Sequence, residues 1–411
     1  MSTKQYEWAA EGGAELAEHS ERKHKILREY VRRYLLERCK SPCSRGLKLL
    51  LVDGFAGGGV YSDGAPGSPV ILLRTLYETV AEINARRVEG DHPALAVKCT
   101  LLLNDIDADA VELLQQRMAD AQRDLPDDAG VILEVVYRTV PFEALAPDIE
   151  RMVKEGKFSN VLLNLDQCGY NAVHSSTLAR LISMTRSVEI LYTIAIRSLF
   201  TYQSVADPER VAKTLRFLDL DPLRQIIGPE IIGKNQFLGA MERLVFDTLE
   251  GCAPFVSPFS IHNPKGWRYW LIHLASVDRA RQVYNDVLHD NSSQQAHYGR
   301  AGLRMLQFDP SHGENGLYLF DQSAREEARE QLPEDLARLI RGYDHEQIGV
   351  GALWRDVYKQ TPAHSDDIHA AMMLHPDVQV FTPRGGERRA ATSIHRDDVV
   401  RLAPQRRFHF G

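Results

Sequence analysis

The chain has 411 residues, of which 44% are hydrophobic and 26% charged, and its formal net charge is −7. This length predicts two or three domains of ordinary globular composition. No apolar run approaches the roughly 20 residues that a membrane-spanning helix needs, and the N-terminus lacks the apolar core of a signal peptide. The acidic balance argues against broad, charge-driven binding of nucleic acid, but it leaves room for a local basic patch.

The five cysteines indicate a reducing compartment. They are odd in number and contain no C-x-x-C pair, so they predict neither a disulfide framework nor a zinc ribbon, and we expect no metal site. We therefore expect a cytoplasmic protein without a membrane partner. The cysteines are Cys39, Cys43, Cys99, Cys168 and Cys252.

A basic amphipathic helix is predicted over residues 20–38, SERKHKILREYVRRYLLER. Its apolar residues recur at i, i+3 and i+4 spacing, so that face should pack on the core. Lys23, His24 and Lys25 lie near its start, ahead of the first strand. One of them could reach a cofactor or substrate from the side; the alternative is an ordinary solvated helix face.

The strongest functional signal is the stretch 47–61, LKLLLVDGFAGGGVY. An aliphatic run that breaks at Asp53 into a glycine-rich loop predicts a buried strand ending in a tight turn. The G-S-P at 67–69 then predicts a helix start, with Ser68 as the N-cap and Pro69 at the first helical position. In an open α/β sheet, the crevice at the carboxyl end of a central strand is where a nucleotide-like ligand binds.

The spacing of these glycines distinguishes between ligands. It fits neither the G-x-G-x-x-G of dinucleotide sites nor the G-K-[ST] ending of a phosphate-binding loop. The segment DGFAGGG resembles instead the first motif of S-adenosylmethionine (SAM) methyltransferases, in the D-x-F-x-G-x-G form common among enzymes that act on nucleic acids. The resemblance implies SAM as cofactor; the alternative is a loop that only lets strand and helix pack closely. The candidate cofactor-binding residues in this segment are Asp53, Gly54, Phe55, Ala56, Gly57 and Gly59.

Strand and helix signals then alternate, which predicts an α/β fold with a parallel sheet covered on both faces. Residues 253–275 form two apolar segments joined by a P-K-G-W turn, which predicts an antiparallel hairpin. Five parallel strands completed by such a hairpin are the order of a Rossmann-like class I methyltransferase sheet. Residues 200–252 would be a helical insertion at its ligand-bearing end. Strands are predicted at 97–104, 131–137, 160–165 and 190–196, and helices at 108–119 and 142–154.

An acidic residue after the second strand is the next candidate. A carboxylate there can accept both hydroxyls of an adenosine ribose in a bidentate bond that a neutral side chain cannot copy. Asp105 directly follows the aliphatic run, with Ile106 beside it, and both are predicted to bind the cofactor. Asp107 is the rival acid and is equally well placed to cap the next helix. The segment LLLNDID also resembles the corresponding part of Dam-type adenine methyltransferases.

The fourth strand ends at NLDQCGY, residues 164–170. Amino-methyltransferases carry [DNS]-P-P-[YFW] here, where a polar side chain and a backbone carbonyl hold the target amine and the aromatic ring stacks on the base. By this resemblance Asp166 and Tyr170 are the candidate catalytic residues, although both prolines are missing. Cys168 offers another interpretation, as the nucleophile of a cytosine-C5 enzyme, but a buried structural cysteine is the commoner case.

The C-terminal segment differs in character. Helices are predicted at 353–358 and 366–374, strands at 378–381 and 399–401, and a basic loop, PRGGERRAATS, lies between the strands. The order helix, helix, strand, loop, strand is typical of a winged helix. Its wing would then contact the phosphates or minor groove of a nucleic acid; the alternative is a docking domain with a solvated charged loop. The candidate nucleic-acid-binding residues are Arg384, Arg388 and Arg389.

Together these motifs resemble the three-Cys-motif partner protein family. The resemblance rests on KHKILREY, on VDGFAGGGVYSDGAPGSP, on DQCG where that family usually has D-P-[FY]-G, and on KGWRYWLIH followed by a helix at 278–289. It implies a bacterial SAM-dependent methyltransferase with a three-cysteine-motif protein as partner, and it says little about the substrate.

Two functions follow from the sequence. The first is methyl transfer from SAM to an amine on a base of DNA or RNA. The second is a non-catalytic subunit of methyltransferase fold that binds or regulates with a partner protein. The predicted organisation is a helical segment at 1–45, a methyltransferase-like domain at 46–290, a helical connector at 291–345 and a winged-helix-like domain at 346–411.

Overall fold

The computed structural model describes residues 8, 13–126, 129–167, 169, 171–195, 216–218, 244–262, 268–291, 295–298, 302–303, 317–318 and 321–404. The chain divides into two compact units, Met1–Val287 and Leu288–Gly411. Cys168, Tyr170 and most of the predicted insertion at 200–252 lie outside the described residues. Among the helices that are described, none is long and apolar enough to cross a membrane.

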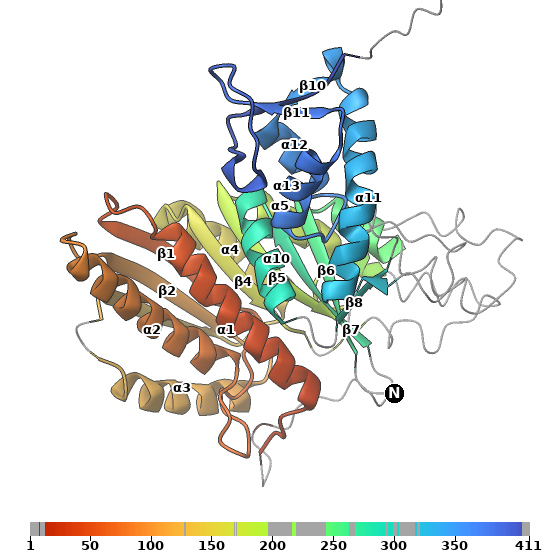
Figure 1. The fold of residues 1–411 in the computed structure, drawn as a ribbon. Helices are drawn as coiled ribbons and strands as arrows, with labels where there is room; N and C mark the ends of the chain where they lie inside the picture. The colour runs from red at the N-terminus through yellow and green to blue at the C-terminus, as the bar shows by residue number, and fades with distance from the viewer. Residues whose placement is uncertain are drawn as a thin grey trace, which may run out of the picture. The chain divides into compact units, whose positions relative to one another are not determined.

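A sheet of long apolar strands forms the core of the first unit (Figure 1). The central strand residues Leu49–Val52 are almost completely buried, as the unbroken aliphatic run predicts. The strands are β1 (Gly46–Asp53), β2 (Ala96–Asn104), β3 (Val131–Arg138), β4 (Asn160–Leu165), β5 (Ser187–Ile194), β6 (Phe255–His262) and β7 (Arg268–Ala275).

These strands lie in the order β3-β2-β1-β4-β5-β7-β6. The first five strands run parallel to one another, whereas β7 is antiparallel to both β5 and β6. Five parallel strands completed by an antiparallel hairpin are what the sequence predicts for a class I methyltransferase sheet. The mixed α/β fold with a mostly parallel sheet is therefore confirmed for this unit.

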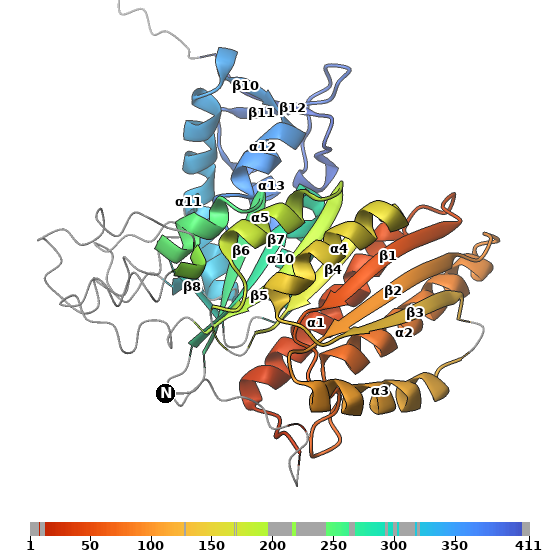
Figure 2. The same ribbon diagram turned by 180° about the vertical axis from the view of Figure 1, so that it is seen from behind.

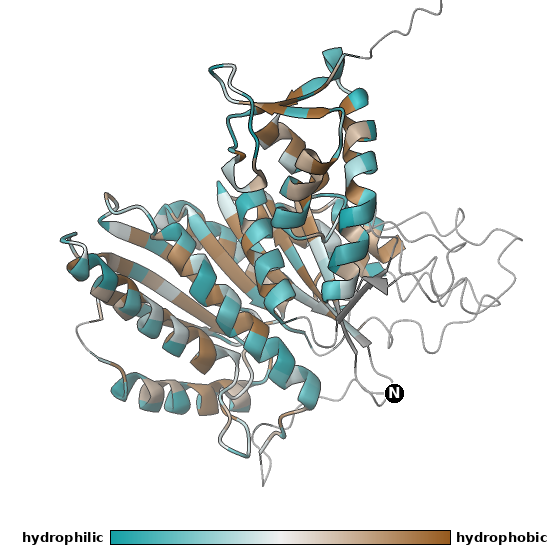
Figure 3. Ribbon diagram, in the orientation of Figure 1, coloured by the Kyte–Doolittle hydropathy of each residue, from teal (hydrophilic) through white to brown (hydrophobic). Residues whose placement is uncertain are grey.

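Helices cover both faces of the sheet (Figures 1 and 2). On one face lie α1 (Glu18–Arg38), α2 (Ser68–Glu89) and α10 (Asp278–Asp290), and on the other lie α4 (Phe142–Gly156) and α5 (Ser175–Ser183). Helix α3 (Ala108–Arg123) follows β2. The hydropathy colouring of Figure 3 shows apolar strands beneath helices of mixed polarity. The predicted apolar face of α1 is buried in full, namely Ile26, Leu27, Tyr30, Val31, Tyr34 and Leu35.

Two local predictions are wrong. The N-cap of α2 is Gly67, which has no side chain to cap the helix, and Ser68 is already the first helical residue, although Pro69 does lie in the first turn. Strand β5 begins at Ser187 rather than at 190 and ends at Ile194 rather than at 196. The hydropathy pattern misses this start because Glu189 lies inside the strand, where it is buried and paired with Arg38.

The second unit contains a small antiparallel sheet in the strand order β10-β12-β11. The helices and strands expected near 353–358, 366–374, 378–381 and 399–401 are present, and β10 is an additional strand. Two further strands, β8 (Gln295–Tyr298) and β9 (Leu317–Tyr318), pair with each other. The other elements are α11 (Gln322–Arg341), β10 (Gln347–Gly349), α12 (Val350–Val357), α13 (Ser365–Leu374), β11 (Val378–Phe381) and β12 (Val399–Leu402).

Candidate functional site

Strands β1, β2 and β4 end at one crevice of the first unit. The pairing register sets Asp53, the last residue of β1, beside Leu103 of β2 and Asn164 of β4. The strand order reverses direction between β1 and β4, and in open α/β sheets such a switch point is where ligands bind. The candidate site is therefore the carboxyl end of the sheet around Asp53.

The glycine loop is fastened to both neighbouring strands. The Gly54 N–H donates to the carbonyl of Asn164 at 3.0 Å, and the Ala56 N–H donates to the carbonyl of Asn104 at 2.8 Å. Gly57 and Gly59 have φ of +58° and +83°, which L side chains rarely adopt. The glycines thus let the loop turn tightly over the strand ends. Of the other predicted residues here, Phe55 stacks on a ring of α4 and Ala56 is buried.

The sequence analysis missed Trp8, which covers this loop. A Cβ added at Gly57 would lie 2.5 Å from the Trp8 ring, and one at Gly58 would lie 3.0 Å from it. The Trp8 ring centroid is also 4.9 Å from that of Tyr61. Gly57 is therefore required both by its φ and by the aromatic ring packed on it. No periodic pattern surrounds Trp8, so the sequence carries no signal for this contact.

Asp105 and Asp107 have different tasks in the structure. Each Asp105 oxygen accepts one backbone hydrogen bond, from Gly57 at 2.8 Å and from Asp107 at 3.0 Å. Burial raises the pKa of Asp105 against the effect of these donors. Asp107 is the N-cap of α3, where its side chain accepts from the Asp109 and Ala110 N–H groups. The rival acid is thus a helix cap, while Asp105 lies against the glycine loop with the 62% exposed Ile106 beside it.

Asp53 is a fully buried carboxyl group at the centre of the crevice. Burial raises its pKa to about 7, although Ser68, the Phe55 N–H and Asn164 all act to lower it. By hydrogen-bonding geometry, neither its Oδ2 nor the Nδ2 of Asn164 has a partner among the described residues, although Asn164 lies close enough to act on the Asp53 carboxyl. An unsatisfied buried polar atom is costly, so two of them side by side mark this crevice as a place for a polar ligand group.

Lys23 of α1 forms an ion pair with Asp166, the residue predicted to bind the methyl acceptor. Its Nζ lies 2.6 Å from each carboxylate oxygen, and the two side chains are 10% and 21% exposed. Burial opposes ionisation of Asp166, but the Lys23 charge and hydrogen bonds outweigh it and keep the pKa of Asp166 below its usual value. A small cavity adjoins the pair, lined by Lys23, His24, Leu27, Ser68, Asn164, Asp166, Leu191, Thr193 and Leu271.

His24 reaches the same cavity as a neutral side chain. Burial lowers its pKa to about 4, even though the nearby Asp166 carboxylate favours protonation. Lys25 is exposed instead. Of the three basic residues at the start of α1, two therefore line the cavity at the strand ends, and contact of either with a cofactor or substrate stays a prediction. Only the third behaves as part of a solvated face.

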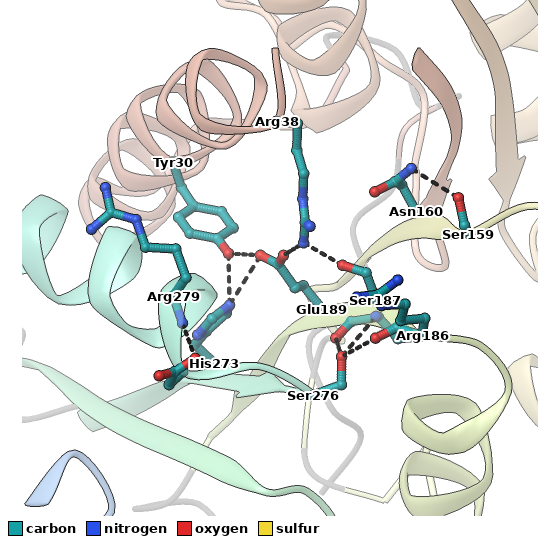
Figure 4. A network of polar contacts seen from close by, with 12 residues as sticks. Tyr30, Arg38, Ser159, Asn160, Arg186, Ser187, Glu189, His273, Ser276 and Arg279 are labelled. Carbon is teal, nitrogen blue, oxygen red and sulfur yellow. Dashed lines mark hydrogen bonds and ion pairs between the residues drawn. The ribbon is translucent and has the colours of Figure 1, made fainter. Parts of the chain in front are cut away.

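A second polar cluster fastens α1 farther along the sheet (Figure 4). The Tyr30 hydroxyl donates to Glu189 of β5 and lies 2.7 Å from Nε2 of His273 on β7. Arg38 donates to Glu189 at 2.7 Å and to the hydroxyl of Ser187. Burial opposes ionisation of Glu189, but His273, Arg38 and Tyr30 together hold its pKa below the usual value. Glu189 and His273 are almost inaccessible, so this cluster is an internal anchor.

The three wing arginines are not equivalent. Arg388 makes two hydrogen bonds to Asp398, at 2.9 and 3.0 Å, and the carboxylate of that partner is fully buried. Arg384 and Arg389 are exposed on the loop between β11 and β12. Arg388 therefore orders the loop from within, and only the other two present their charge to solvent.

Comparison with known proteins finds no family model and no curated protein that matches the chain. Among solved structures it is similar to the O-methyltransferase from Bacillus cereus in complex with S-adenosylhomocysteine (SAH), at 13% identity over 63% of this chain and 84% of that chain, with a TM-score of 0.27. It is also similar to magnesium protoporphyrin IX methyltransferase from Synechocystis PCC 6803 with bound SAH, at 13% identity over 62% and 84% of the two chains, with a TM-score of 0.26.

A third similar structure is the O-methyltransferase TomG from Streptomyces achromogenes in complex with SAM, at 12% identity over 64% of this chain and 92% of that chain, with a TM-score of 0.26. These identities and TM-scores are too low to support an argument about ligand or reaction. The fold assignment accordingly rests on the strand order, and the assignment of the site rests on its residues.

Proposed function

We propose that this protein is a SAM-dependent methyltransferase. One observation carries the proposal: the glycine loop after β1, the Asp105 carboxylate after β2 and the polar end of β4 converge at the switch point of a class I sheet. An adenosyl cofactor needs a hydrogen-bond acceptor for its ribose hydroxyls, a backbone that approaches the cofactor closely and an apolar side chain against its flat adenine ring. Asp105, the loop glycines and Ile106 offer these three features in that order.

The donors and acceptors present fit such a cofactor. Asp105 accepts two backbone hydrogen bonds, and a carboxylate has about four acceptor positions, so it can also accept from a ribose. The unpartnered Asp53 Oδ2 and Asn164 Nδ2 supply an acceptor and a donor for a polar end of the ligand. When bound, SAM supplies an electrophilic methyl group. The chain's own residues bind the cofactor and the methyl acceptor and orient them.

The acceptor that we propose is an amine on a nucleic-acid base. Attack of an amine on a sulfonium needs no strong base, because the proton can leave afterwards, but it needs alignment within about 3–3.5 Å. Asp166, at the carboxyl end of β4, would accept a hydrogen bond from that amine, and Tyr170 would flank a flat acceptor. The cavity beside Asp166 supports this role for the carboxylate.

The second unit supports a nucleic-acid partner through the order of its elements. Its elements follow the order helix, strand, helix, helix, strand, loop, strand, with the sheet order β10-β12-β11, and this order supports our proposal of a winged helix. We propose that Arg384 and Arg389 contact phosphates from its wing. Replacing both with alanine should weaken binding to duplex DNA or RNA and flatten its salt dependence. If the unchanged protein binds neither at low salt, the unit is a protein-docking module.

A non-catalytic binding subunit is the second candidate, and one observation favours it. Both oxygens of Asp166 are already occupied by Lys23, and the prolines that usually follow this acid are missing. In that case the fold would bind SAM or a relative of it and act with a partner. The sequence resemblance to the three-Cys-motif partner family makes a bacterial three-cysteine-motif protein our proposed partner.

Calorimetric titration of SAH tests the cofactor assignment. Changing Asp105→Asn keeps the size of the side chain but removes the charge, and it should weaken SAH binding by about tenfold to a hundredfold. The matched control is Asp107→Ser, which keeps the α3 cap and should leave the affinity unchanged. Equal SAH affinity in a folded Asp105→Asn variant would refute the role of this carboxylate.

Labelled-methyl transfer to DNA, RNA and protein extracts tests the reaction. Asp166→Ala should abolish transfer, and it should spare SAH binding where the contacts of this carboxylate are to the methyl acceptor alone. Cys168→Ser should leave the rate largely intact, in contrast to a cytosine-C5 enzyme. Full activity in Asp166→Ala would remove the amine mechanism, and loss of activity in Cys168→Ser would favour covalent catalysis. SAH binding without transfer to any extract would favour the non-catalytic subunit.

A further inference from the structure

We propose that the Lys23–Asp166 ion pair is an exchangeable lock. A ligand that carries both an ammonium or amine group and an anionic oxygen group would open it, with Lys23 taking the anion and Asp166 taking the amine. This inference rests on the proposed function for the identity of the cofactor, and it adds the charge pattern that the site selects.

The first step is the position of the pair. Lys23 donates to both oxygens of Asp166 at 2.6 Å, and these two side chains form part of the wall of the small cavity at the strand ends. The centroid of the Tyr269 ring lies 5.6 Å from the Lys23 Nζ, within the range of a cation–π contact. An amine is therefore already hydrogen-bonded to the carboxylate where we place the acceptor amine, and it is supplied by the protein itself.

Polar side chains of the cavity wall surround the Lys23–Asp166 pair. Asn164 and Thr193 line the same cavity and are 6% and 1% exposed. The Thr193 hydroxyl acts on Asp166 and helps to lower the pKa of that carboxyl, and the Asn164 Nδ2 makes no hydrogen bond of ordinary geometry to any described residue. Asn164 Nδ2 is a donor, and the Thr193 hydroxyl can donate and accept. Such atoms are costly when nothing binds them. A ligand with polar groups of both kinds satisfies them, whereas an apolar ligand does not.

The third step concerns charge. A ligand bearing only an amine would displace Lys23 from Asp166 and so separate a poorly hydrated ammonium from its carboxylate, which is unfavourable. A ligand with an amine and an anionic group replaces one ion pair by two. The pair should therefore discriminate in favour of a zwitterion, or of an amine that lies near a phosphate or carboxylate.

The fourth step is that α1 does not depend on this pair for its place. Tyr30 and Arg38 fasten the same helix to Glu189, well inside the sheet (Figure 4). The lock can therefore open without releasing the helix. Two sources carry the required chemistry: the ammonium and carboxylate at the methionyl end of SAM, or an acceptor amine beside a phosphate.

Calorimetric titration distinguishes the two sources. SAH carries the amino-acid end, and 5′-methylthioadenosine is the matched ligand without it. If the cofactor opens the lock, Lys23→Met should weaken SAH binding at least tenfold and change 5′-methylthioadenosine binding less than twofold. If the methyl acceptor opens the lock, Lys23→Met should leave the SAH affinity unchanged. In SAH-loaded protein, the ratio of the affinity for adenosine monophosphate to that for adenosine should then be at least tenfold lower in Lys23→Met than in wild type.

Two further variants keep the test decisive. Lys25→Met, at an exposed position on the same helix, should behave as wild type in both titrations, and Lys23→Arg should retain most of the discrimination because it keeps the charge. If a folded Lys23→Met variant keeps both wild-type affinity ratios, SAH to 5′-methylthioadenosine and adenosine monophosphate to adenosine, the inference is overturned while the cofactor assignment stands. Failure of the wild-type protein to bind either SAH or 5′-methylthioadenosine would refute the proposed function, and the inference with it.

Discussion

Among the described residues, two ionic contacts between helix α1 and the sheet differ in burial. At Glu189 the carboxylate is 1% exposed and is bonded to both Tyr30 and Arg38. At Asp166 the carboxylate is 21% exposed, has Lys23 as its cationic partner and adjoins a cavity with unpartnered polar atoms. One kind of ion pair can therefore serve as an anchor or as a binding element, according to whether the polar groups around it already have hydrogen-bond partners.

The difference follows from position along one strand. Alternate residues of β5 face α1, from Ser187 and Glu189 near the start to Thr193 near the carboxyl end. The ligand crevice of such sheets lies at the carboxyl ends. The contact at Glu189 therefore falls within the packed body of the sheet, and the contact at Asp166 falls at the crevice.

Breaking the anchor should have the largest effect on stability. Glu189→Gln leaves Arg38 without its counter-ion, and breaking a buried pair costs about 3–5 kcal/mol. Urea unfolding of the first unit would measure the loss of unfolding free energy. Glu150→Gln, at the exposed pair with Arg180, is the control and should cost at most about 1 kcal/mol. Equal losses in the two variants would contradict the anchoring role.

Asp53 is a second buried carboxyl group, and within the described part of the chain no cation acts on it. Its pKa is about 7 when folded and near 3.9 when unfolded, so the folded state holds a proton that the unfolded state has lost between these values. This group therefore makes the wild-type protein less stable as pH rises from about 4 to about 7. Asp53→Asn should remove that contribution, which amounts to at most about 4 kcal/mol.

The measurement is the difference in unfolding free energy between Asp53→Asn and wild type at about pH 4.5 and about pH 7.5. The unfolding free energy of the variant should rise relative to that of the wild type at the higher pH. Taking the difference between variant and wild type cancels the pH dependence that other groups contribute. His24 is one such group, because its lowered pKa makes the folded state more stable as pH rises through the acidic range. A difference that does not change with pH would show that Asp53 ionises normally in the folded protein.

Much of the fold could be predicted from the sequence, because unbroken aliphatic runs and a glycine loop leave few alternatives to a parallel sheet. The strand order and the buried face of α1 follow from such local patterns. What the pattern missed depends on contacts between distant segments. Glu189 inside β5 is tolerated only because Arg38 pairs with it, and Trp8 reaches the glycine loop across more than 40 positions of the chain.

The site shows the same division. The sequence placed Asp53, Asp105 and Asp166 at strand ends, because the residue that closes an apolar run is visible in one dimension. It favoured Asp105 over Asp107 because Asp105 directly follows the aliphatic run, and the structure adds that Asp107 caps α3. The sequence could not pair Lys23 with Asp166, since 143 positions separate them and nothing local links a helix start to a strand end.

The smallest stability effect should come from Lys23→Met, at the other end of the comparison. Exposed pairs contribute about 0–1 kcal/mol and buried pairs cost about 3–5 kcal/mol to break, so this partly exposed pair should cost about 1–2 kcal/mol at neutral pH. The pKa of Asp166 is lowered by Lys23, so the stability that the pair contributes is present above the ordinary Asp pKa and is lost as pH falls.

The gap in unfolding free energy between wild type and Lys23→Met should therefore close in acid, where Asp166 becomes protonated in both proteins. Adding Asp166→Asn to Lys23→Met should recover part of the loss at neutral pH, because no uncompensated carboxylate is left beside the cavity. Urea unfolding of the wild type, both single variants and the double variant at two pH values would complete the cycle. A loss as large as that of Glu189→Gln would make Lys23 a second anchor of α1, because a contact that the helix needs in order to stay folded cannot also open for a ligand.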